Sequence, residues 1–541
     1  MRPPTRRPTR HAHSIVAAVA GAVATAAVLV GPVLGPGYAL YLDHVAVPDP
    51  ARPQWQDLGA PSGLRAWPLS GVTWAWSQLL PTWTFQHLVL VAAVLGAGLG
   101  VGMVLRLQGS VVAFSGAVLA IANPYVVERL LLGQASLLLA YAALPWIVLA
   151  SRQPTPRRRV GLVTLASVPA ALTPWGALVA GVGAVSVALI RRRSGGEVAS
   201  QALASGALCL PWLVPALLMR PGPADPQGAY AFRLADDVGL GTLGSALAGG
   251  GVWSSAAQLS ARQGAVGVTS TVVIVTLAAL GAWSVTRARP LVGTVVVATW
   301  LGIPLATALL SGPALPLWAD LQTAPGMALF RDLHRLLAPS VVALVLLAAV
   351  GTRRLVSATT QGQRAATAVL GVVLPVSLAV MLVPGGSARL HSAYEPGPFS
   401  EEWPRAVAAT GDRGGVLSLP WQPLRQTSWM PYPFLDPTGN SMGVRAVTDP
   451  TLTVVRDGRS ITVRDPARSP GQGDLDDTLV RHLTRTSGDP VPSELLASSR
   501  IQHVLVWKDS PGPMPGRPSE WTVTFSGADF EVWSDEGVAS R

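Results

Sequence analysis

The sequence has few charged residues. Of its 541 residues only 13% are Asp, Glu, Lys or Arg, whereas a soluble globular protein carries about 25%. Half of the residues are hydrophobic and the mean hydropathy is +0.41. One membrane-spanning helix needs roughly 20 apolar residues, and the long runs of Ala, Val, Leu and Gly provide many such segments. The composition therefore excludes an ordinary soluble protein and predicts a polytopic α-helical membrane protein.

Cysteine and lysine are almost absent, since Cys209 and Lys508 are the only examples. One cysteine excludes an intramolecular disulfide and a CxxC metal site, and its apolar surroundings indicate a residue facing lipid or another helix. The sequence contains no P-loop, no GxSxG and no HExxH, so it offers no built-in ATPase, serine-hydrolase elbow or zinc-protease motif.

The formal net charge of +11 is not spread over the whole chain. Residues 1–384 hold 25 Lys+Arg against 10 Asp+Glu, whereas residues 385–541 hold 15 against 19. The positive excess thus belongs to the apolar part, as expected for a membrane protein. It predicts membrane lipids as partners and no nucleic acid.

Eleven apolar runs are predicted to span the membrane. They cover residues 15–36, 85–106, 109–123, 134–150, 160–174, 175–190, 199–219, 264–284, 290–311, 336–350 and 365–384. The fifth and sixth are short and meet at Pro174, so ten or twelve crossings stay open. The first run is long for a signal-peptide core and no clear small-residue cleavage site follows it, so we interpret it as an uncleaved span.

Acidic residues are nearly missing from the loops on one side of this arrangement. With the N-terminus inside, the inner side collects 17 arginines and a single acid, Glu197, whereas the outer side of residues 1–384 has 8 arginines and 9 acids. Positive charge is retained on the cytoplasmic side. The pattern predicts a multi-pass plasma-membrane protein with its N-terminus inside and its C-terminus outside.

Three regions follow from this topology. Residues 1–14 form a basic cytoplasmic N-terminus, residues 15–384 a multi-span domain with an outer loop at 37–84, and residues 385–541 an extracytoplasmic soluble domain. Within the outer loop, residues 67–80 are Trp-rich and fit an amphipathic helix on the bilayer surface.

The C-terminal region is patterned for a mixed α/β or mostly β domain. TLTVVRDGRSITV predicts two strands around an Asp457–Gly458 turn. SELLASSRIQHVLVW predicts a short helix followed by a buried strand, and WTVTFSGADFEVW predicts a closing hairpin. We find no internal sequence repeat.

The first candidate site is Asp43, in GPGYALYLDHVAVPDP just after the first span. A carboxylate near the bilayer is costly to bury and is often functional. Such a carboxylate suits a general base, for example one that takes a proton from a sugar hydroxyl. His44 and Asp49 are placed to support it or to help bind a metal or phosphate. The alternative is an ordinary solvated acid beyond a helix end.

The second candidate is NPYVVERLLLGQ, where Glu128 and Arg129 interrupt an apolar stretch. One interpretation is a mutual surface salt bridge. The other is that Arg129 binds an anionic lipid phosphate while Glu128 orients it, since the guanidinium matches phosphate geometry.

The third candidate is the segment FRDLHR, in which Arg331, His334 and Arg335 precede a span on the outer side. Cations are disfavoured there, so they need compensation, which a lipid-linked phosphate would supply. In a helical segment Asp332 and Arg335 lie one turn apart, as do Arg331 and His334. The alternative is snorkelling toward headgroups.

In the C-terminal region, LPWQPLRQTSW gathers Trp421, Gln422, Arg425 and Trp429. Aromatic rings beside amides suit carbohydrate, so Trp421, Gln422 and Trp429 are candidates for acceptor binding. Tryptophan is equally a core residue.

The layout resembles the GT-C superfamily of integral-membrane glycosyltransferases. NPYVVERLLLGQ and GMALFRDLHRLLAP are similar to segments of actinobacterial arabinofuranosyltransferase-type membrane proteins. The resemblance implies a polyprenyl-phosphate sugar donor, a glycan or lipid-linked acceptor, a catalytic Asp43, and donor-phosphate binding by Arg331, His334, Arg335 and Arg129. The family's cue is often an acidic pair, whereas His44 follows Asp43 here, so a divalent cation cofactor is left open. A lipid-linked glycan exporter or flippase and a non-catalytic envelope assembly factor remain alternatives, since fold does not fix activity.

Overall fold

The computed structural model describes residues 7–55, 58, 61–219, 224–360, 362–411, 413–456, 458–464, 477–485 and 488–535. The chain forms two compact units. The first consists of Met1–Pro32, Leu88–Pro211 and Pro226–Ser392, and the second of Val33–His87, Trp212–Asp225 and Ala393–Arg541. The segment between the first two predicted spans therefore belongs to the same unit as the C-terminal region.

Apolar helices dominate the first unit, and two of them extend into the second. They are α1 (Arg7–Val30), α4 (Thr82–Leu105), α5 (Ser110–Ile121), α7 (Ala135–Ala150), α8 (Pro156–Ser167), α9 (Pro174–Ile190), α10 (Gly195–Met219), α13 (Ala265–Ala288), α14 (Pro290–Ser311), α16 (Ala338–Thr359) and α17 (Arg364–Leu382). Each of the eleven predicted spans falls on one of these helices. Among the described residues, eight helical segments are long and apolar enough to cross a membrane. The chain is therefore a polytopic membrane protein, while the count of eleven crossings stays a prediction.

The junction at Pro174 is a break between two short helices. After α8, the 3-10 turn η4 (Ala170–Leu172) leads to Thr173, whose side chain accepts a hydrogen bond from the Gly176 N–H at 3.1 Å. Thr173 is thus the N-cap of α9, and Pro174 occupies the first helical position, where its missing N–H costs nothing.

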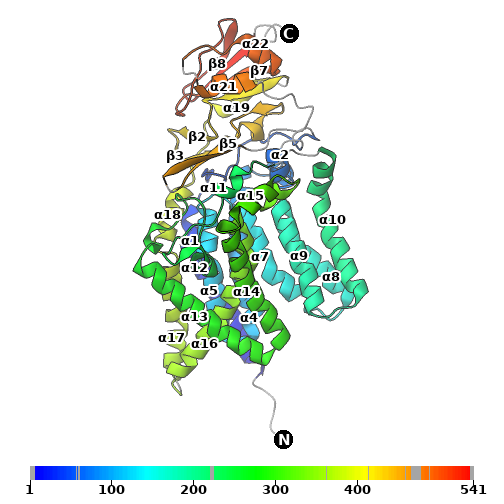
Figure 1. Ribbon diagram of the computed structural model, residues 1–541, viewed down its shortest axis with the longest axis vertical. Helices are drawn as coiled ribbons and strands as arrows, with labels where there is room; N and C mark the ends of the chain where they lie inside the picture. Colours follow the sequence, from blue (N-terminus) through cyan, green and yellow to red (C-terminus); the bar gives the residue numbers. More distant parts are fainter. Residues whose placement is uncertain are drawn as a thin grey trace. The chain divides into compact units, whose positions relative to one another are not determined.

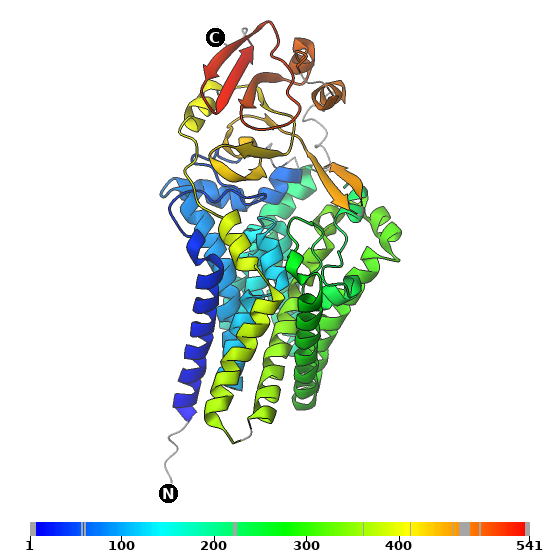
Figure 2. The ribbon, with the colours of Figure 1, turned by 90° about the vertical axis from the view of Figure 1, so that its left-hand side faces the viewer.

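Glycine sets the closest helix contact of the first unit, between α13 and α16. A Cβ at Gly281 would lie 1.9 Å from the carbonyl oxygen of Leu347, and a Cβ at Gly351 would lie 1.9 Å from that of Leu277. The two helices thus approach each other backbone to backbone at reciprocal positions, as small residues permit between membrane helices. α16 also packs on α5, which contacts α1 and α17, and these helices lie side by side in Figures 1 and 2.

Short elements connect the long helices of the first unit. They include α6 (Pro124–Leu130), α11 (Gln227–Ala231), α12 (Gly241–Leu247), η5 (Ser260–Arg262), α15 (Leu315–Gln322), η6 (Met327–Phe330) and η7 (Leu333–Leu337). Several of them carry the charged residues described below.

The second unit is built on a five-stranded sheet with the order β4-β1-β7-β9-β8. Its strands are β1 (Gly415–Leu419), β4 (Ala446–Val447), β7 (Ile501–Trp507), β8 (Trp521–Ser526) and β9 (Phe530–Asp535). β1 pairs in parallel with β4 and β7, whereas β9 pairs antiparallel with β7 and β8. Separate two-stranded ribbons are formed by β2 (Leu424–Thr427) with β3 (Met430–Leu435) and by β5 (Thr451–Arg456) with β6 (Arg459–Arg464).

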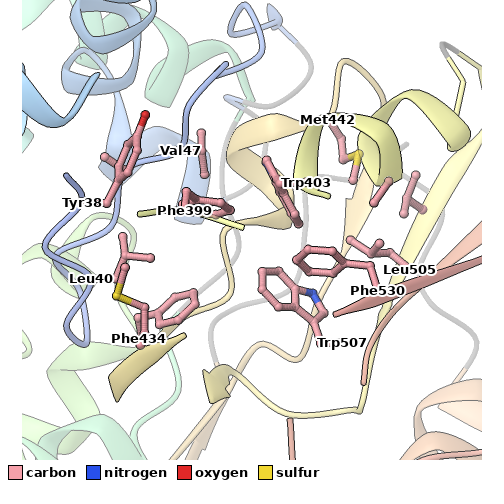
Figure 3. Close-up of a cluster of buried hydrophobic side chains, with 14 of the residues drawn as sticks. Tyr38, Leu40, Val47, Phe399, Trp403, Phe434, Met442, Leu505, Trp507 and Phe530 are labelled. Carbon is pink, nitrogen blue, oxygen red and sulfur yellow. The ribbon is translucent and has the colours of Figure 1, made fainter. Parts of the chain in front are cut away.

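Both faces of the sheet are buried, because alternate residues of the central strands enter two different cores. Leu505 and Trp507 of β7 join one core with α19 (Trp403–Ala409) and residues of the 38–47 segment, as Figure 3 shows. Val504 and Val506 join the other, which also receives leucines from α21 (Asp477–Arg485) and α22 (Ser493–Ser498). A strand covered on both faces reads as a nearly continuous apolar run, which is what IQHVLVW presents.

The local patterns of the C-terminal region are confirmed. β5 and β6 form the predicted hairpin, with Gly458 at φ +71, although Asp457 itself lies outside the described residues. α22 leads into β7, and β8 and β9 form the closing hairpin. In the outer loop, α2 (Pro61–Ala66) precedes α3 (Leu69–Ser77), which lies within the predicted helix at 67–80 and has no buried residue.

Gly281→Ala is expected to destabilise the first unit by about 1–3 kcal/mol, because the added methyl group forces α13 away from the α16 backbone. The measurement is the thermal unfolding midpoint of the detergent-purified protein. Gly302→Ala in α14 is the matched control, since a Cβ there meets no atom within 4 Å. Equal midpoints for the two variants would contradict the close contact.

Candidate functional site

Seven charged or titratable residues meet inside the first unit, and we call them the charged network. They are Glu128, Arg129, Asp237, Arg262, Asp332, His334 and Arg335. All are buried except Arg335, whose side chain is 18% exposed. Buried charges on this scale must be paired and hydrogen-bonded. Five of the seven were candidate residues from the sequence, or neighbours of one.

Helix α6 fixes the first two members. The Asn123 side chain caps this helix by accepting from the Val126 N–H at 3.1 Å, and Pro124 follows at its first position. Asn-Pro before a short helix is a local start signal. It sets the direction in which Glu128 and Arg129 leave the last turn.

Arg129 uses all five of its N–H donors on protein acceptors. Nη1 and Nη2 form a bidentate pair with Asp332 at 2.6 and 2.9 Å. Nη1 also donates to Gln134 Oε1 at 2.7 Å, while Nε and Nη2 approach His334 Nδ1 at 3.1 and 2.7 Å. The guanidinium has five donors and no acceptor, so its hydrogen-bonding capacity is filled within the fold.

Besides Arg129, the Asp332 side chain has two further hydrogen-bond donors. Its side chain accepts from the His334 N–H at 3.1 Å and so caps η7, and it also accepts from Trp253 Nε1 at 3.3 Å. Burial raises the pKa of the Asp332 carboxyl, but the surrounding positive groups, chiefly Arg129 and then Arg335, together outweigh burial and hold this pKa below its usual range. The predicted one-turn pairing with Arg335 is confirmed, at 3.2 Å.

The contacts of His334 determine which of its nitrogens carries the proton. Arg129 can only donate, so Nδ1 must be an acceptor and the ring proton resides on Nε2. Nε2 faces Glu128 Oε2 at 3.4 Å, and the same carboxylate oxygen accepts from the Val252 N–H at 3.3 Å. His334 is therefore a neutral link between Glu128 and Arg129 rather than a third cation.

Asp237 and Arg262 complete the network. Arg262 Nε lies 3.1 Å from Asp237 Oδ2 and its Nη1 donates to the Leu382 carbonyl at 2.9 Å. Glu128 is close enough to both to interact electrostatically. Gly250 lets the backbone approach this pair, because a Cβ there would lie 2.5 Å from Asp237 Oδ2.

The network is balanced, with three carboxylates against three guanidiniums. Two features differ from the sequence interpretation. Glu128 and Arg129 do not form a surface ion pair, because both are buried and their nearest polar partners are other residues. Of the basic residues of FRDLHR, Arg335 obtains compensation within the fold, from Asp332. Arg331 is half-buried, with its guanidinium 4.9 Å from the Phe232 ring centroid.

Asp43 lies in the second unit, at the exposed apex of a tight turn. Tyr41 and His44 flank it and exchange backbone hydrogen bonds of 3.1 and 2.8 Å. Leu42 adopts φ 45, a left-handed conformation that is costly for a branched side chain and is tolerated where surrounding structure enforces it. Leu42 is held by backbone hydrogen bonds with Pro433 and Leu435.

His44 anchors this turn in a buried aromatic setting, with its ring 4.9 Å from that of Tyr394. Burial, reinforced by the nearby His87, lowers the pKa of His44 to about 3, so the imidazole is neutral near pH 7. Asp49 is exposed. Within the described part of the chain, no three His, Cys, Asp or Glu side chains gather as a metal-binding group.

The aromatic residues of LPWQPLRQTSW lie mainly in the interior of the second unit. Trp421 is 4% exposed and Arg425 is fully buried, paired with Asp436 at 2.6 Å. Trp429 is half-buried, with its ring 5.0 Å from Phe399, and Gln422 donates to Ser510 at 2.9 Å. These contacts are those of packing residues, and acceptor binding by Trp421, Gln422 and Trp429 stays a prediction.

Sequence reasoning did not identify Asp237, Arg262 and Trp253 as members of the network. No local motif marks them. The one available signal was an arginine, Arg262, and an adjacent pair of aspartates, Asp236 and Asp237, in an outer segment, whose charges need partners if they are buried.

Arg129→Met is expected to lower the free energy of unfolding by about 3–5 kcal/mol, because it leaves a buried carboxylate without its bidentate partner. Arg129→Met combined with Asp332→Asn is expected to recover part of this loss, since the buried carboxylate that lost Arg129 is no longer charged. Thermal unfolding followed by fluorescence-detected size exclusion measures both. Strictly additive effects of the two substitutions would refute the pairing.

Stability of the second unit is expected to fall as pH drops from about 6.5 toward 3. The unfolded chain takes up a proton at His44 near pH 6.5, whereas the folded chain does not until about pH 3, so acid favours unfolding. The loss is about 2 kcal/mol at pH 5, because each pH unit below 6.5 costs about 1.4 kcal/mol. Unfolding midpoints at pH 7.5 and 5 should differ less in His44→Phe than in the wild type, and equal differences would contradict the buried neutral ring.

No protein-family model and no curated protein matches the chain by sequence. Solved structures do resemble it. A cryo-EM structure of the arabinofuranosyltransferase AftD from Mycobacteria matches with a TM-score of 0.53 and 15% identity, over 96% of this chain and 39% of that one. A point mutant of the same protein matches with a TM-score of 0.52 and 16% identity, over 97% and 42%. A crystal structure of the Archaeoglobus fulgidus oligosaccharyltransferase gives 0.36 and 11%, over 91% and 67%.

The likeness to AftD extends over nearly the whole of this chain but only about two fifths of the AftD chain. At 15–16% identity it establishes the fold alone. The chain thus shares the fold of the matched part of this membrane protein.

Proposed function

We propose that the chain is a membrane glycosyltransferase of the GT-C type. It transfers a sugar from a polyprenyl-phosphate donor to a glycan or lipid-linked acceptor at the outer face of the plasma membrane, in envelope glycan assembly. The observation that carries the proposal is the fold shared with an arabinofuranosyltransferase over 96% of the chain. The sugar, the acceptor and the linkage are left unassigned.

The predicted topology supports a reaction at one side of the membrane. In the topology with the arginine-rich loops inside, Asp43 and every member of the charged network belong to the outer side. The residues proposed for proton removal and for phosphate stabilisation therefore face the same aqueous phase.

The presentation of Asp43 supports its role as general base. It is exposed at a turn apex whose two flanks are held by backbone hydrogen bonds and by the buried His44. A base must reach the hydroxyl that it deprotonates and must be held in position. The left-handed Leu42 is the kind of backbone strain found at functional sites.

The charged network supports a phosphate-binding role in which some residues contact the phosphate and others hold them in position. Arg331 and Arg335 are the partly exposed cations of FRDLHR, so we assign them the contact with the donor phosphate. Arg129 and His334 are buried and act as positioning residues, because they hold Asp332, which in turn holds Arg335.

The proposed reaction is one displacement. The acceptor hydroxyl gives its proton to Asp43, and its oxygen forms a bond to the anomeric carbon. The bond between that carbon and the phosphate oxygen breaks, and the polyprenyl phosphate leaves with the bonding electron pair. Arg331 and Arg335 stabilise the negative charge that develops on it.

The two other functions differ in what happens to the substrate. The charged network places several ionisable groups inside the helical unit, which a polar export path also requires, but these groups are paired with one another. An exporter or flippase moves a lipid-linked glycan unchanged, and an assembly factor leaves it in place. We therefore favour transfer, which alone forms a new glycosidic bond.

Asp43→Asn is expected to lower the rate of sugar transfer by about 10²–10⁴-fold, because the amide cannot accept the hydroxyl proton. The measurement is the formation of labelled product from a labelled polyprenyl-phosphate sugar in proteoliposomes containing the full chain. Covalent product separates transfer from export.

Asp320→Asn is the control, since Asp320 is an exposed acid in α15 of the first unit and has no part in the proposed reaction. Both variants should insert and elute as the wild type does. Full turnover by Asp43→Asn would remove Asp43 from the mechanism, and absence of product from the wild type with every donor offered would favour export or assembly.

A further inference from the structure

A second group of arginines lies in the first unit, within residues 152–193, a segment that contributes no member to the charged network. A narrow pocket there is lined by the ends of α7, α8, α9 and α10. Its lining residues are Ser151, Arg159, Val163, Ala184, Ala188, Arg191, Arg193, Glu197 and Gln201. We call it the arginine pocket.

Glu197 is the acidic residue that lines the pocket, and it pairs with the buried Arg159. Arg159 is 5% exposed and forms a bidentate pair with Glu197 at 2.6 and 3.2 Å, and its Nη1 donates to the Gln153 carbonyl at 2.7 Å. Arg193 reaches Glu197 only at 3.9 Å. The single acid is thus largely committed to Arg159.

The remaining cations of the pocket are in excess. Arg191 is exposed at the rim and experiences repulsion from Arg159, Arg193 and Arg289. Arg152, next to the lining residue Ser151, experiences repulsion from Arg106, Arg191 and Arg289. This clustering raises the energy of the site unless an anion lies among the guanidiniums.

Buried donors independently indicate a ligand. Gln201 is 3% exposed and lines the pocket, yet its Nε2 has no hydrogen-bond partner, and the same holds for the buried Arg193 Nε and Arg152 Nη1. A buried donor without an acceptor costs about 1–3 kcal/mol. An oxyanion in the pocket would accept from the two lining donors, Gln201 Nε2 and Arg193 Nε, and its charge suits Arg191 and Arg193.

The surroundings favour an anion that carries apolar chains. The helices that form the pocket expose leucines, at Leu162 and Leu165 on α8, Leu189 on α9 and Leu203 on α10. Leu189 and Leu203 lie two residues from Arg191 and Gln201. The site therefore combines a polar pocket rich in unpaired donors with an apolar surface suited to acyl chains.

We propose that the arginine pocket binds the phosphate headgroup of an anionic membrane lipid. In the topology proposed above the pocket faces the cytoplasmic leaflet, where the arginine-rich loops collect. The site is separate from the residues assigned to sugar transfer, so the proposal holds whether or not transfer occurs.

The test is native mass spectrometry of the full chain in detergent, titrated with phosphatidylglycerol, with phosphatidylcholine, or with inorganic phosphate. Wild type should retain phosphatidylglycerol in preference to phosphatidylcholine, whose choline cation is repelled by the arginines. Arg191→Gln with Arg193→Gln, and separately Gln201→Leu, should each weaken binding about tenfold, as the loss of charge-assisted hydrogen bonds predicts.

Arg157→Gln with Arg158→Gln is the matched control, because it removes the same charge from two exposed residues of α8 that do not line the pocket. This control should bind as the wild type does. An equal loss in the control, or no loss with Gln201→Leu, would attribute retention to general charge attraction and overturn the proposal. Displacement of the lipid by inorganic phosphate at equal concentration would overturn it in favour of a free-anion site.

Discussion

The bidentate contact between Arg129 and Asp332 is the constraint on which the charged network depends. It joins two short elements, α6 and η7, that are separated by 203 positions in the sequence. Inside an apolar helical unit each charge alone would be costly to bury, and the pair offsets that cost only when its geometry is good and its remaining donors are satisfied. Both conditions hold, because all five donors of Arg129 have acceptors. Such a pair contributes more to fixing one arrangement than to raising stability.

This fixed arrangement gives the fold a cation at a defined place. Asp332 pairs with the buried Arg129 and also with the partly exposed Arg335. Because Arg129 fixes the carboxylate in position, Arg335 is held in position too. The His334 ring lies between Arg129 and Glu128, with Nδ1 2.7 Å from Arg129 Nη2 and Nε2 3.4 Å from Glu128 Oε2. An electrostatic catalyst requires charges that are oriented before the reaction begins. The network meets that requirement with groups that need not touch the substrate.

Local signals in the sequence were sufficient for the elements but not for their long-range partners. Hydropathy located all eleven helices at the predicted spans, and period-two alternation with Gly458 located the β5–β6 hairpin. The pairing of Arg129 with Asp332, and of Asp237 with Arg262, depends on which loops fold back over the helices, and no local pattern encodes that. Adjacent charges such as Glu128 and Arg129 suggest each other as partners in a sequence, whereas on one helical turn they point to different neighbours.

The first unit contains two groups of arginines, one in the charged network and one in the arginine pocket, and they differ in how far their charge is matched by carboxyl groups. Around Arg129 and Arg262 three carboxyl groups accompany three guanidiniums, so the formal charges of this group are matched within the fold. Around Arg191 and Arg193 one carboxylate, Glu197, is shared with Arg159, and buried donors are left over. An unbalanced cluster persists only if something outside the chain compensates it, and at the ends of apolar helices the available anion is a lipid phosphate. The charge balance of each group, more than its arginine content, therefore indicates whether it needs an external partner.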